Sequence, residues 1–313
     1  MLTRQVLFMI FAFIVSFAFT FATTPLVRRF AFKIGAIDIP KDNRRMHKKP
    51  TPRIGGLAII FGFTVATLCF AQPSRQLYGT LAGAAIIAVM GVIDDCKNLP
   101  AKLKFVIQII AALVVVFAGD IKIDVFTNPN FLSDNPYWVL PEWLSVTLTV
   151  IWIVFITNAV NFIDGLDGLA AGVSAIMSIS LVFISIRVGE YSIAILGIAL
   201  MGSCFGFLPF NFNPAKIFMG DTGSLALGGF LAALAVLTRQ ELLFILIGGV
   251  FLVETLSVII QVVSFKTRGK RVFKMAPIHH HFEMLGWTEQ QVVISFWFLG
   301  FICGIIGIVL GVM

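Results

Sequence analysis

The sequence predicts an all-α integral membrane protein, a single domain over residues 1–313 with about ten transmembrane helices. Hydrophobic residues make up 58% of the chain, charged residues make up 12%, and the mean hydropathy is +0.98. With so few charged residues, the chain lacks the polar surface needed to cover a water-soluble globular protein of this length. The alternating segments of outer-membrane barrels are absent, so helices are the structure that can satisfy every backbone group in lipid.

The apolar runs have the length of roughly 20 residues that a helix needs to cross the hydrocarbon core. Their approximate positions are 5–30, 54–72, 78–93, 103–119, 143–160, 168–187, 191–209, 222–238, 241–264 and 291–312. The first run lacks a small-residue cleavage signal, so we expect a retained helix. The four cysteines are scattered, and this predicts neither disulfides nor a zinc ribbon.

Lys and Arg are divided unevenly between the two sets of loops that ten spans place on opposite sides. One set carries 18 of the 23 basic residues, in segments 28–53, 97–104, 216 and 266–274. Because basic loops stay in the cytoplasm, we expect this face to be cytoplasmic and both termini to be extracytoplasmic. The dense polar motifs fall on the same face, which predicts an enzyme with a cytosolic active site. A channel or carrier would more often place charges at mid-depth.

Two motifs end predicted spans with carboxylates. Asp94 and Asp95 in GVIDDCKNLPAK can share a divalent cation, or one can coordinate the cation while the other acts as a base. The alternative is a simple pair of charges at a helix end. NFIDGLDGLAAG adds Asn161, Asp164 and Asp167, with glycines that allow a sharp turn. If this segment is helical, the two aspartates share one face and point into a cleft. A structural loop with capping aspartates is the alternative.

The segment NFNPAKIFMGDTGS enters the eighth predicted span. Its glycines, hydroxyls and helix-start amides suit a phosphate, and Asp221 can hold Mg²⁺ against that phosphate. Phe218 can stack on a base. The segment has neither a Walker lysine nor a GxGxxG pattern. Five aspartates on a lysine-rich face predict a divalent cation with a polyanion, as phosphoryl transfer requires, and carboxylate ligands favour Mg²⁺ over zinc.

MAPIHHHFEMLGW holds His279, His280 and His281, three of the four histidines of the chain. Consecutive side chains cannot all converge on one ion in a regular helix or strand, and HExxH spacing is absent. After the basic segment 266–274, we expect a loop that forms a basic lid over a phosphate-sugar substrate, with imidazoles that donate hydrogen bonds or protons. Glu254, inside the ninth predicted span, is a functional candidate, but a kink or an interhelical hydrogen bond explains it equally well.

VIDDCKNL, NAVNFIDGLDGLAAG, NPAKIFMGDTGSLALGG and PIHHHFEMLGW, in this order between about residues 35 and 290, resemble the motifs of the polyprenyl-phosphate N-acetylhexosamine-1-phosphate transferases. PIHHHFE followed by GW is most similar to the branch with a muramoyl-pentapeptide donor. The resemblance implies a ten-span enzyme of the bacterial cytoplasmic membrane. It would move phospho-MurNAc-pentapeptide from its UDP carrier to undecaprenyl phosphate, release UMP and require Mg²⁺. The predicted partners are these substrates and membrane lipid, without nucleic acid; a homodimer is left open.

The resemblance also implies roles for individual residues. Asp221 resembles the Mg²⁺ ligand. Asp94 and Asp95 resemble the acidic pair proposed to act on the lipid phosphate or on the attack of that phosphate on the donor. Direct attack and a phosphorylated aspartate would use the same carboxylates. His279, His280 and His281 match the histidine motif and are catalytic candidates. The substrate-binding candidates, several of them matching a uridine pocket, are Lys48, Asn161, Asp164, Gly165, Leu166, Asp167, Asn211 and Phe218.

The first cytosolic loop departs from the muramoyl pattern. That branch commonly reads GTPTMGG, whereas this chain has KPTPRIGG from Lys49 to Gly56, more like the branch that transfers N-acetylglucosamine phosphate. The latter branch usually carries HxHH without the following Phe-Glu. Because the histidine motif is the one tied to sugar choice, we expect the muramoyl donor. An N-acetylglucosamine-1-phosphate transferase is the alternative, and a lipid or solute transporter is the second.

Overall fold

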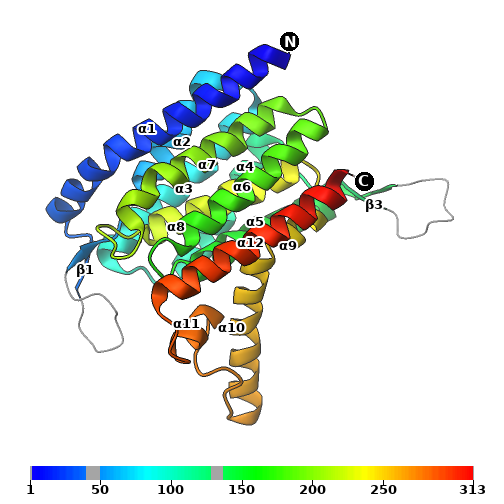
Figure 1. Cartoon of the computed structure of the whole chain (residues 1–313). Coiled ribbons are helices and arrows are strands. Elements are labelled where there is room, and N and C mark those ends of the chain that lie inside the picture. Colours follow the sequence, from blue (N-terminus) through cyan, green and yellow to red (C-terminus); the bar gives the residue numbers. More distant parts are fainter. Residues whose placement is uncertain (1, 40–49, 128–136, 313) are drawn as a thin grey trace.

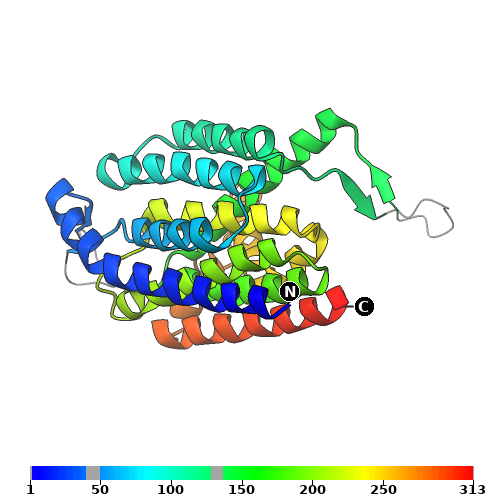
Figure 2. The same cartoon turned by 90° about the horizontal axis from the view of Figure 1, so that it is seen from above.

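A computed structural model of the chain describes residues 2–39, 50–127 and 137–312 and confirms the all-α fold. The long helices lie close to the predicted spans. They are α1 (Leu2–Ile34), α2 (Gly56–Phe70), α3 (Arg75–Lys97), α4 (Ala101–Gly119), α5 (Glu142–Ile163), α6 (Leu169–Arg187), α7 (Tyr191–Asn211), α8 (Gly220–Leu237) and α12 (Glu289–Val312). Helices α1 and α12 have their terminal ends at the same end of the bundle (Figures 1 and 2).

The ninth predicted span is not one helix. The prediction of a continuous span over 241–264 is wrong, because the chain forms α9 (Glu241–Ile247) and α10 (Gly249–Arg268) with a break at Gly248. A pair of glycines at this point weakens the helix, and sharp kinks are typical there. Helix α10 leaves the bundle at a steep angle, and the short helix α11 (Ile278–Glu283) lies beside it (Figure 1).

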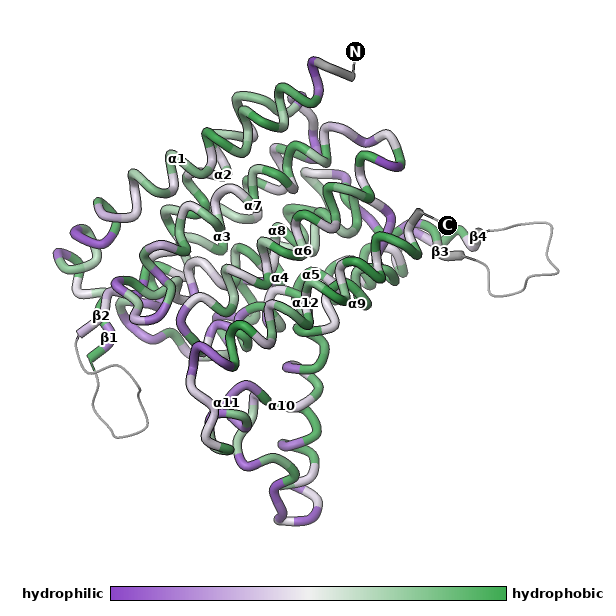
Figure 3. The backbone as a smooth tube through the Cα atoms, viewed as in Figure 1, coloured by the Kyte–Doolittle hydropathy of each residue, from purple (hydrophilic) through white to green (hydrophobic). Residues whose placement is uncertain are grey.

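The helices have the dimensions and surface of a membrane bundle. Within the three described segments, nine helices are long and apolar enough to cross a membrane, α10 among them, whereas α2 has 15 residues. Large apolar side chains are exposed on their flanks; Phe11, Phe117 and Ile151 are 48%, 59% and 59% exposed. The helices are hydrophobic along their length, and hydrophilic residues gather toward their ends (Figure 3). The chain is a multi-pass membrane protein.

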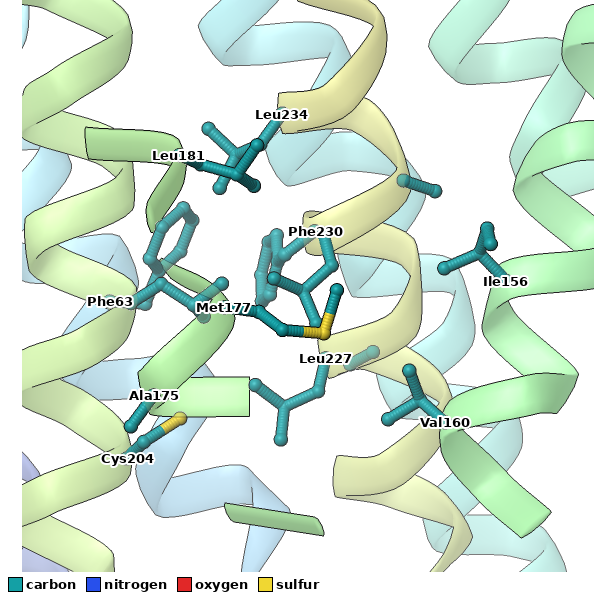
Figure 4. Close-up of a cluster of buried hydrophobic side chains, with 14 of the residues drawn as sticks. Phe63, Ile156, Val160, Ala175, Met177, Leu181, Cys204, Leu227, Phe230 and Leu234 are labelled. Atoms are coloured by element: carbon teal, nitrogen blue, oxygen red, sulfur yellow. The ribbon is translucent and has the colours of Figure 1, made fainter. Parts of the chain in front are cut away.

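The core surrounds α8, which packs against α2, α3 and α5. Phe230 of α8 meets Phe63 of α2 with ring centroids 4.1 Å apart, and Met177 of α6 and Val160 of α5 complete the layer (Figure 4). At Gly228 of α8, a Cβ would lie 2.6 Å from the Cα of Thr157 on α5. Small residues at such contacts allow helix backbones to approach closely in membrane proteins. This packing fixes the position of the first turn of α8 relative to α3 and α5.

Two short hairpins extend from opposite ends of the bundle (Figure 1). Strands β1 (Ile37–Asp38) and β2 (Thr51–Pro52) pair antiparallel, and so do β3 (Val125–Thr127) and β4 (Tyr137–Val139). The amide of Phe218 donates to the carbonyl of Pro52 at 2.7 Å, and the amide of Gly55 donates to the carbonyl of Phe218 at 2.9 Å. The first hairpin is therefore bonded to the segment that leads into α8.

Candidate active site

Asp94, Asp95 and Asp221 come together where α3 ends and α8 begins. One carboxylate oxygen from each lies within 4.8 Å of the others. The approach is possible because Gly91 of α3 has no side chain, and a Cβ there would overlap the backbone of Thr222. The predicted association of these three aspartates is therefore present in the structure, although α3 and α8 are far apart in the sequence.

Lys104, in the first turn of α4, bridges two of the three carboxylates. Its Nζ lies 3.1 Å from Asp94 Oδ2 and 2.9 Å from Asp221 Oδ2. In the sequence, Lys104 was only one of the basic residues of the predicted cytoplasmic face, and this role was not predicted. The available signal was its place near a helix N-terminus, where a cation opposes the helix dipole and therefore favours an anionic partner. The contact shows that Asp94 and Asp221 together attract a cation.

Asp95 holds the start of α8. Its Oδ2 accepts hydrogen bonds from the amide of Thr222 at 3.1 Å and from its hydroxyl at 2.7 Å, and its Oδ1 accepts from the amide of Asp221 at 3.3 Å. The Nε of Arg53 lies 3.5 Å from the same Oδ1. The expectation that these helix-start donors face a phosphate is therefore wrong for Asp221 and Thr222, because Asp95 already accepts from them.

Asn161 joins α5 to the cluster. Its Nδ2 donates to Asp221 Oδ1 at 3.1 Å and to Ser224 Oγ at 2.8 Å. Ser224 Oγ in turn donates to the carbonyl of Gly220 at 3.0 Å. The two oxygens of Asp221 are thus oriented by different helices, one by Asn161 on α5 and the other by Lys104 on α4. Asn161, predicted as a substrate-binding residue, is placed here as a neighbour of the proposed metal ligand.

Asp164 and Asp167 do not share a helix face. Helix α5 ends at Ile163, and a turn follows until α6 begins at Leu169. Burial raises the pKa of the Asp164 carboxyl well above its usual value, and the negative charges of Asp221, Asp95 and Asp167 add to this shift. The Asp167 Oδ2 instead accepts from the amide of Ala215 at 2.8 Å. The turn therefore directs one carboxyl toward the acidic cluster and the other toward the segment between α7 and α8.

The turn between α5 and α6 is bonded to that α7–α8 segment. Asn211 is 3% exposed; its Oδ1 accepts from the amide of Gly168, and its Nδ2 donates to the carbonyl of Ile217, both at 3.1 Å. Leu166 is buried, and Phe218 is half-buried. The structure thus brings the predicted uridine-pocket residues into two adjoining segments. Lys48, also predicted to bind substrate, lies outside the described residues.

Glu289, the first residue of α12, was missed by sequence analysis. Its Oε1 accepts from the amide of Asp167 at 2.7 Å, and its Oε2 accepts from the Nδ2 of Asn213 at 2.6 Å. An acidic residue in the first turn of a helix is common because of the helix dipole, so its sequence position gave no functional signal. In the structure, Glu289 connects α12 to both segments of the predicted uridine pocket.

The three histidines lie on the short helix α11 and not in the predicted loop, and each contacts a different partner. The Nδ1 of His279 is 3.1 Å from Glu254 Oε2, and the Nδ1 of His280 is 2.7 Å from Glu283 Oε2. The Nδ1 of His281 accepts from the amide of Lys274 at 3.1 Å. Each Nδ1 thus has a different partner, as expected of consecutive residues that cannot all converge on one ion. Glu254, the functional candidate inside the ninth predicted span, therefore has His279 as a neighbour.

Gly220 offers a test of the close contact between the start of α8 and Arg53, the residue that follows β2. It has φ of +70°, and a Cβ there would overlap the carbonyl oxygen of Arg53 and lie 2.6 Å from Asp95 Oδ2. Gly269 has φ of +65° with no atom within 4 Å of such a Cβ. Both substitutions by alanine meet the left-handed backbone cost of roughly 1–2 kcal/mol, but only G220A adds an overlap. We therefore expect G220A to lower the thermal unfolding midpoint clearly more than G269A; equal shifts would contradict this packing.

Comparisons with known proteins agree with the motifs. The sequence profile of the family described as glycosyl transferase family 4 matches residues 77–239, which include Asp94, Asp95, Lys104, Asn161 and Asp221. The phospho-N-acetylmuramoyl-pentapeptide-transferases of Bacillus cytotoxicus, Bacillus mycoides and Bacillus anthracis are each 40% identical to this chain over 314 residues. Each alignment covers 96% of this chain and 96% of the relative. The chain therefore belongs to glycosyl transferase family 4 and, within it, to the phospho-N-acetylmuramoyl-pentapeptide-transferases.

Proposed function

We propose that this membrane enzyme transfers phospho-MurNAc-pentapeptide from UDP-MurNAc-pentapeptide to undecaprenyl phosphate and releases UMP. The observation that carries the proposal is the cluster of Asp94, Asp95 and Asp221 with Lys104, at one end of a bundle of apolar helices. A lipid-linked acceptor can reach such a site from the membrane, and a soluble nucleotide can reach it from water. Identity of 40% over nearly the whole chain supports the muramoyl donor over N-acetylglucosamine.

The carboxylate cluster fits Mg²⁺. Carboxylate oxygens are its preferred protein ligands, and it usually takes one or two of them together with substrate phosphates and water. Asp94 and Asp221 would hold the ion, since they already share the ammonium of Lys104, whereas Asp95 is bonded to Thr222. Bound Mg²⁺ would supply positive charge to the phosphates of the substrates. The proposed metal site thus has two protein ligands, Asp94 and Asp221, where the resemblance of the motifs suggested Asp221 alone.

The residues around the cluster can position the reacting groups. In the transfer, an oxygen of undecaprenyl phosphate bonds to the phosphorus attached to the sugar, and the bond from that phosphorus to UMP breaks. Lys104 can pair with phosphate oxygens in the transition state, because its ammonium lies in the cluster and is only partly buried. Asn161 keeps Asp221 in place. The segments joined by Asn211 and Glu289 would bind the nucleoside.

The donor is tested with the purified full-length protein, undecaprenyl phosphate and Mg²⁺. UMP release is measured in parallel with UDP-MurNAc-pentapeptide and with UDP-N-acetylglucosamine. We expect release from the muramoyl donor, and we expect chelation of the metal to abolish it. Release from UDP-N-acetylglucosamine alone would establish the alternative branch and overturn the proposed donor.

The cytoplasmic location of the site is part of the proposal. The uneven distribution of Lys and Arg supports it, because Arg53 and Lys104 lie in the carboxylate cluster itself. In a cysteine-free variant, we expect Q72C, in the turn between α2 and α3, to react with a membrane-impermeant maleimide on intact cells. K97C, at the other end of α3, should react only after permeabilisation; both positions are exposed. The reverse pattern would place the active site outside.

The transporter alternative loses its best support. An intramembrane carboxylate such as Glu254 favours a transporter, but the contact with His279 gives Glu254 a structural partner. Transport without chemistry would be indicated if Asp221→Asn abolished substrate flux and left turnover intact. A homodimer stays a prediction.

A further inference from the structure

Glu254 is a buried carboxylate that the proposed chemistry does not use. It lies on α10, a few residues after the break at Gly248, and its side chain is 0% exposed. A carboxylate away from water is strongly unfavourable unless a partner compensates its charge. An ionisable residue inside a membrane segment is therefore a functional candidate whose partner must be identified.

His279 is that partner. Its Nδ1 lies 3.1 Å from Glu254 Oε2, and both side chains are 0% exposed. Within the described residues, neither nitrogen of His279 and neither oxygen of Glu254 forms a directed hydrogen bond, so this close Nδ1–Oε2 contact is the polar contact that relates the two side chains. The contact joins α10, which leaves the bundle, to α11, which carries the histidine motif (Figure 1).

The opposite edge of the His279 ring rests on the turn between α5 and α6. A Cβ at Gly165 would overlap Nε2 of His279 and would lie 3.0 Å from its Cε1. Gly165 follows Asp164 and precedes the residues that Asn211 and Glu289 hold. The ring also meets that of His280, with centroids 4.2 Å apart, and the side chain of His280 is 27% exposed. His279 therefore lies between Glu254, the nucleoside turn and an accessible histidine.

We propose that Glu254 is a positioning residue for donor binding. It orients the His279 imidazole, which in turn sets the backbone of Gly165 and the ring of His280. His279 then acts through its neighbours without contacting substrate, and of these two histidines it is His280 that the donor reaches. This division of roles rests on the proposed function. It also explains why position 165 is glycine, since a side chain there would displace the imidazole.

The kinetic test uses Glu254→Gln, which keeps the shape of the side chain and removes its charge. We expect the KM for UDP-MurNAc-pentapeptide to rise about tenfold, comparable to the smaller effects of removing a residue that orients a metal-bound histidine. The KM for undecaprenyl phosphate should stay within about twofold of the wild-type value, because Glu254 acts through His279 on the turn that is proposed to bind the nucleoside of the donor. Glu241→Gln is the matched control: Glu241 is 8% exposed, lies on α9 of the same broken helix, and should leave both KM values unchanged.

A double-variant cycle separates positioning from general destabilisation. If Glu254 acts through His279, combining Glu254→Gln with His279→Asn should raise the donor KM no further than the more severe single variant. Multiplied effects of the two single variants would overturn the proposal. So would a fall in kcat with an unchanged donor KM.

A spectroscopic measurement tests the proposed role of Glu254 without relying on activity. If the wild-type protein turned over neither donor, the proposed function would be wrong, but this measurement would still test the positioning of His279. The chain has four histidines, so a ¹⁵N-histidine spectrum of protein without a histidine tag can be assigned with single His→Asn variants. We expect Glu254→Gln to shift the His279 and His280 ring signals, and Glu241→Gln to shift neither. An unmoved His279 signal in Glu254→Gln would overturn the proposal.

Discussion

Asp221→Asn is expected to lower turnover at least about a hundredfold, the range seen when a general acid-base group or an electrostatic group is removed. The substitution keeps the size of the side chain but removes the charge that Lys104 and the proposed Mg²⁺ require. UMP release is measured at saturating concentrations of both substrates. Asp94→Asn should have an effect of the same order, because Asp94 is the other carboxylate bonded to Lys104.

Two comparisons make the Asp221 result specific. Asp124→Asn removes a carboxylate that is 53% exposed at the opposite end of the bundle, and it should leave turnover near the wild-type value. Asp95→Asn should lower the thermal unfolding midpoint as well as turnover, since Asp95 accepts three hydrogen bonds from the start of α8. A near-normal rate for Asp221→Asn would remove Asp221 from the site.

Lys104→Met is expected to change turnover and metal affinity in opposite directions. Turnover should fall about a hundredfold or more, because a cation that stabilises phosphate charge in the transition state is lost. The apparent affinity for Mg²⁺ should rise, because the ammonium that now lies between Asp94 and Asp221 no longer competes with the metal. Both quantities come from Mg²⁺ titrations of UMP release.

Lys102→Met is the matched control for Lys104→Met. Lys102 is exposed and lies two residues earlier on α4, so its replacement should leave both quantities near the wild-type values. Unchanged turnover in Lys104→Met would mean that Lys104 only balances charge in the resting protein. A weaker Mg²⁺ affinity would mean that Lys104 holds the carboxylates in place for the metal.

The lengths of the apolar runs predicted most of the helices. A helix in lipid must cover the hydrocarbon thickness and form all of its backbone hydrogen bonds internally. The ends of α5, α6 and α7 consequently lie within about three residues of the predicted spans. The break between α9 and α10 was not predicted. The residues on both sides of Gly248 and Gly249 are apolar, so hydropathy alone does not reveal the interruption; the glycine pair is the signal that was overlooked.

The acidic part of the site was predictable because its members lie at span ends on one face. The partners were not, since Lys104, Glu289 and Glu254 acquire their roles from contacts between segments distant in sequence. Helical spacing suggested a shared face for Asp164 and Asp167, and a turn forms there instead. Side-chain type therefore predicted the chemistry of the site, while packing of α4, α10 and α12 decided which residues meet.

The assignment of the active site to the carboxylates at the ends of α3 and α8 is tested most directly by anomalous diffraction from crystals grown with Mn²⁺ in place of Mg²⁺. One strong peak per chain is expected beside Asp94 and Asp221, with no such peak in Asp221→Asn crystals. A peak at His279, His280 or His281, or a peak that persists in Asp221→Asn, would contradict the assignment.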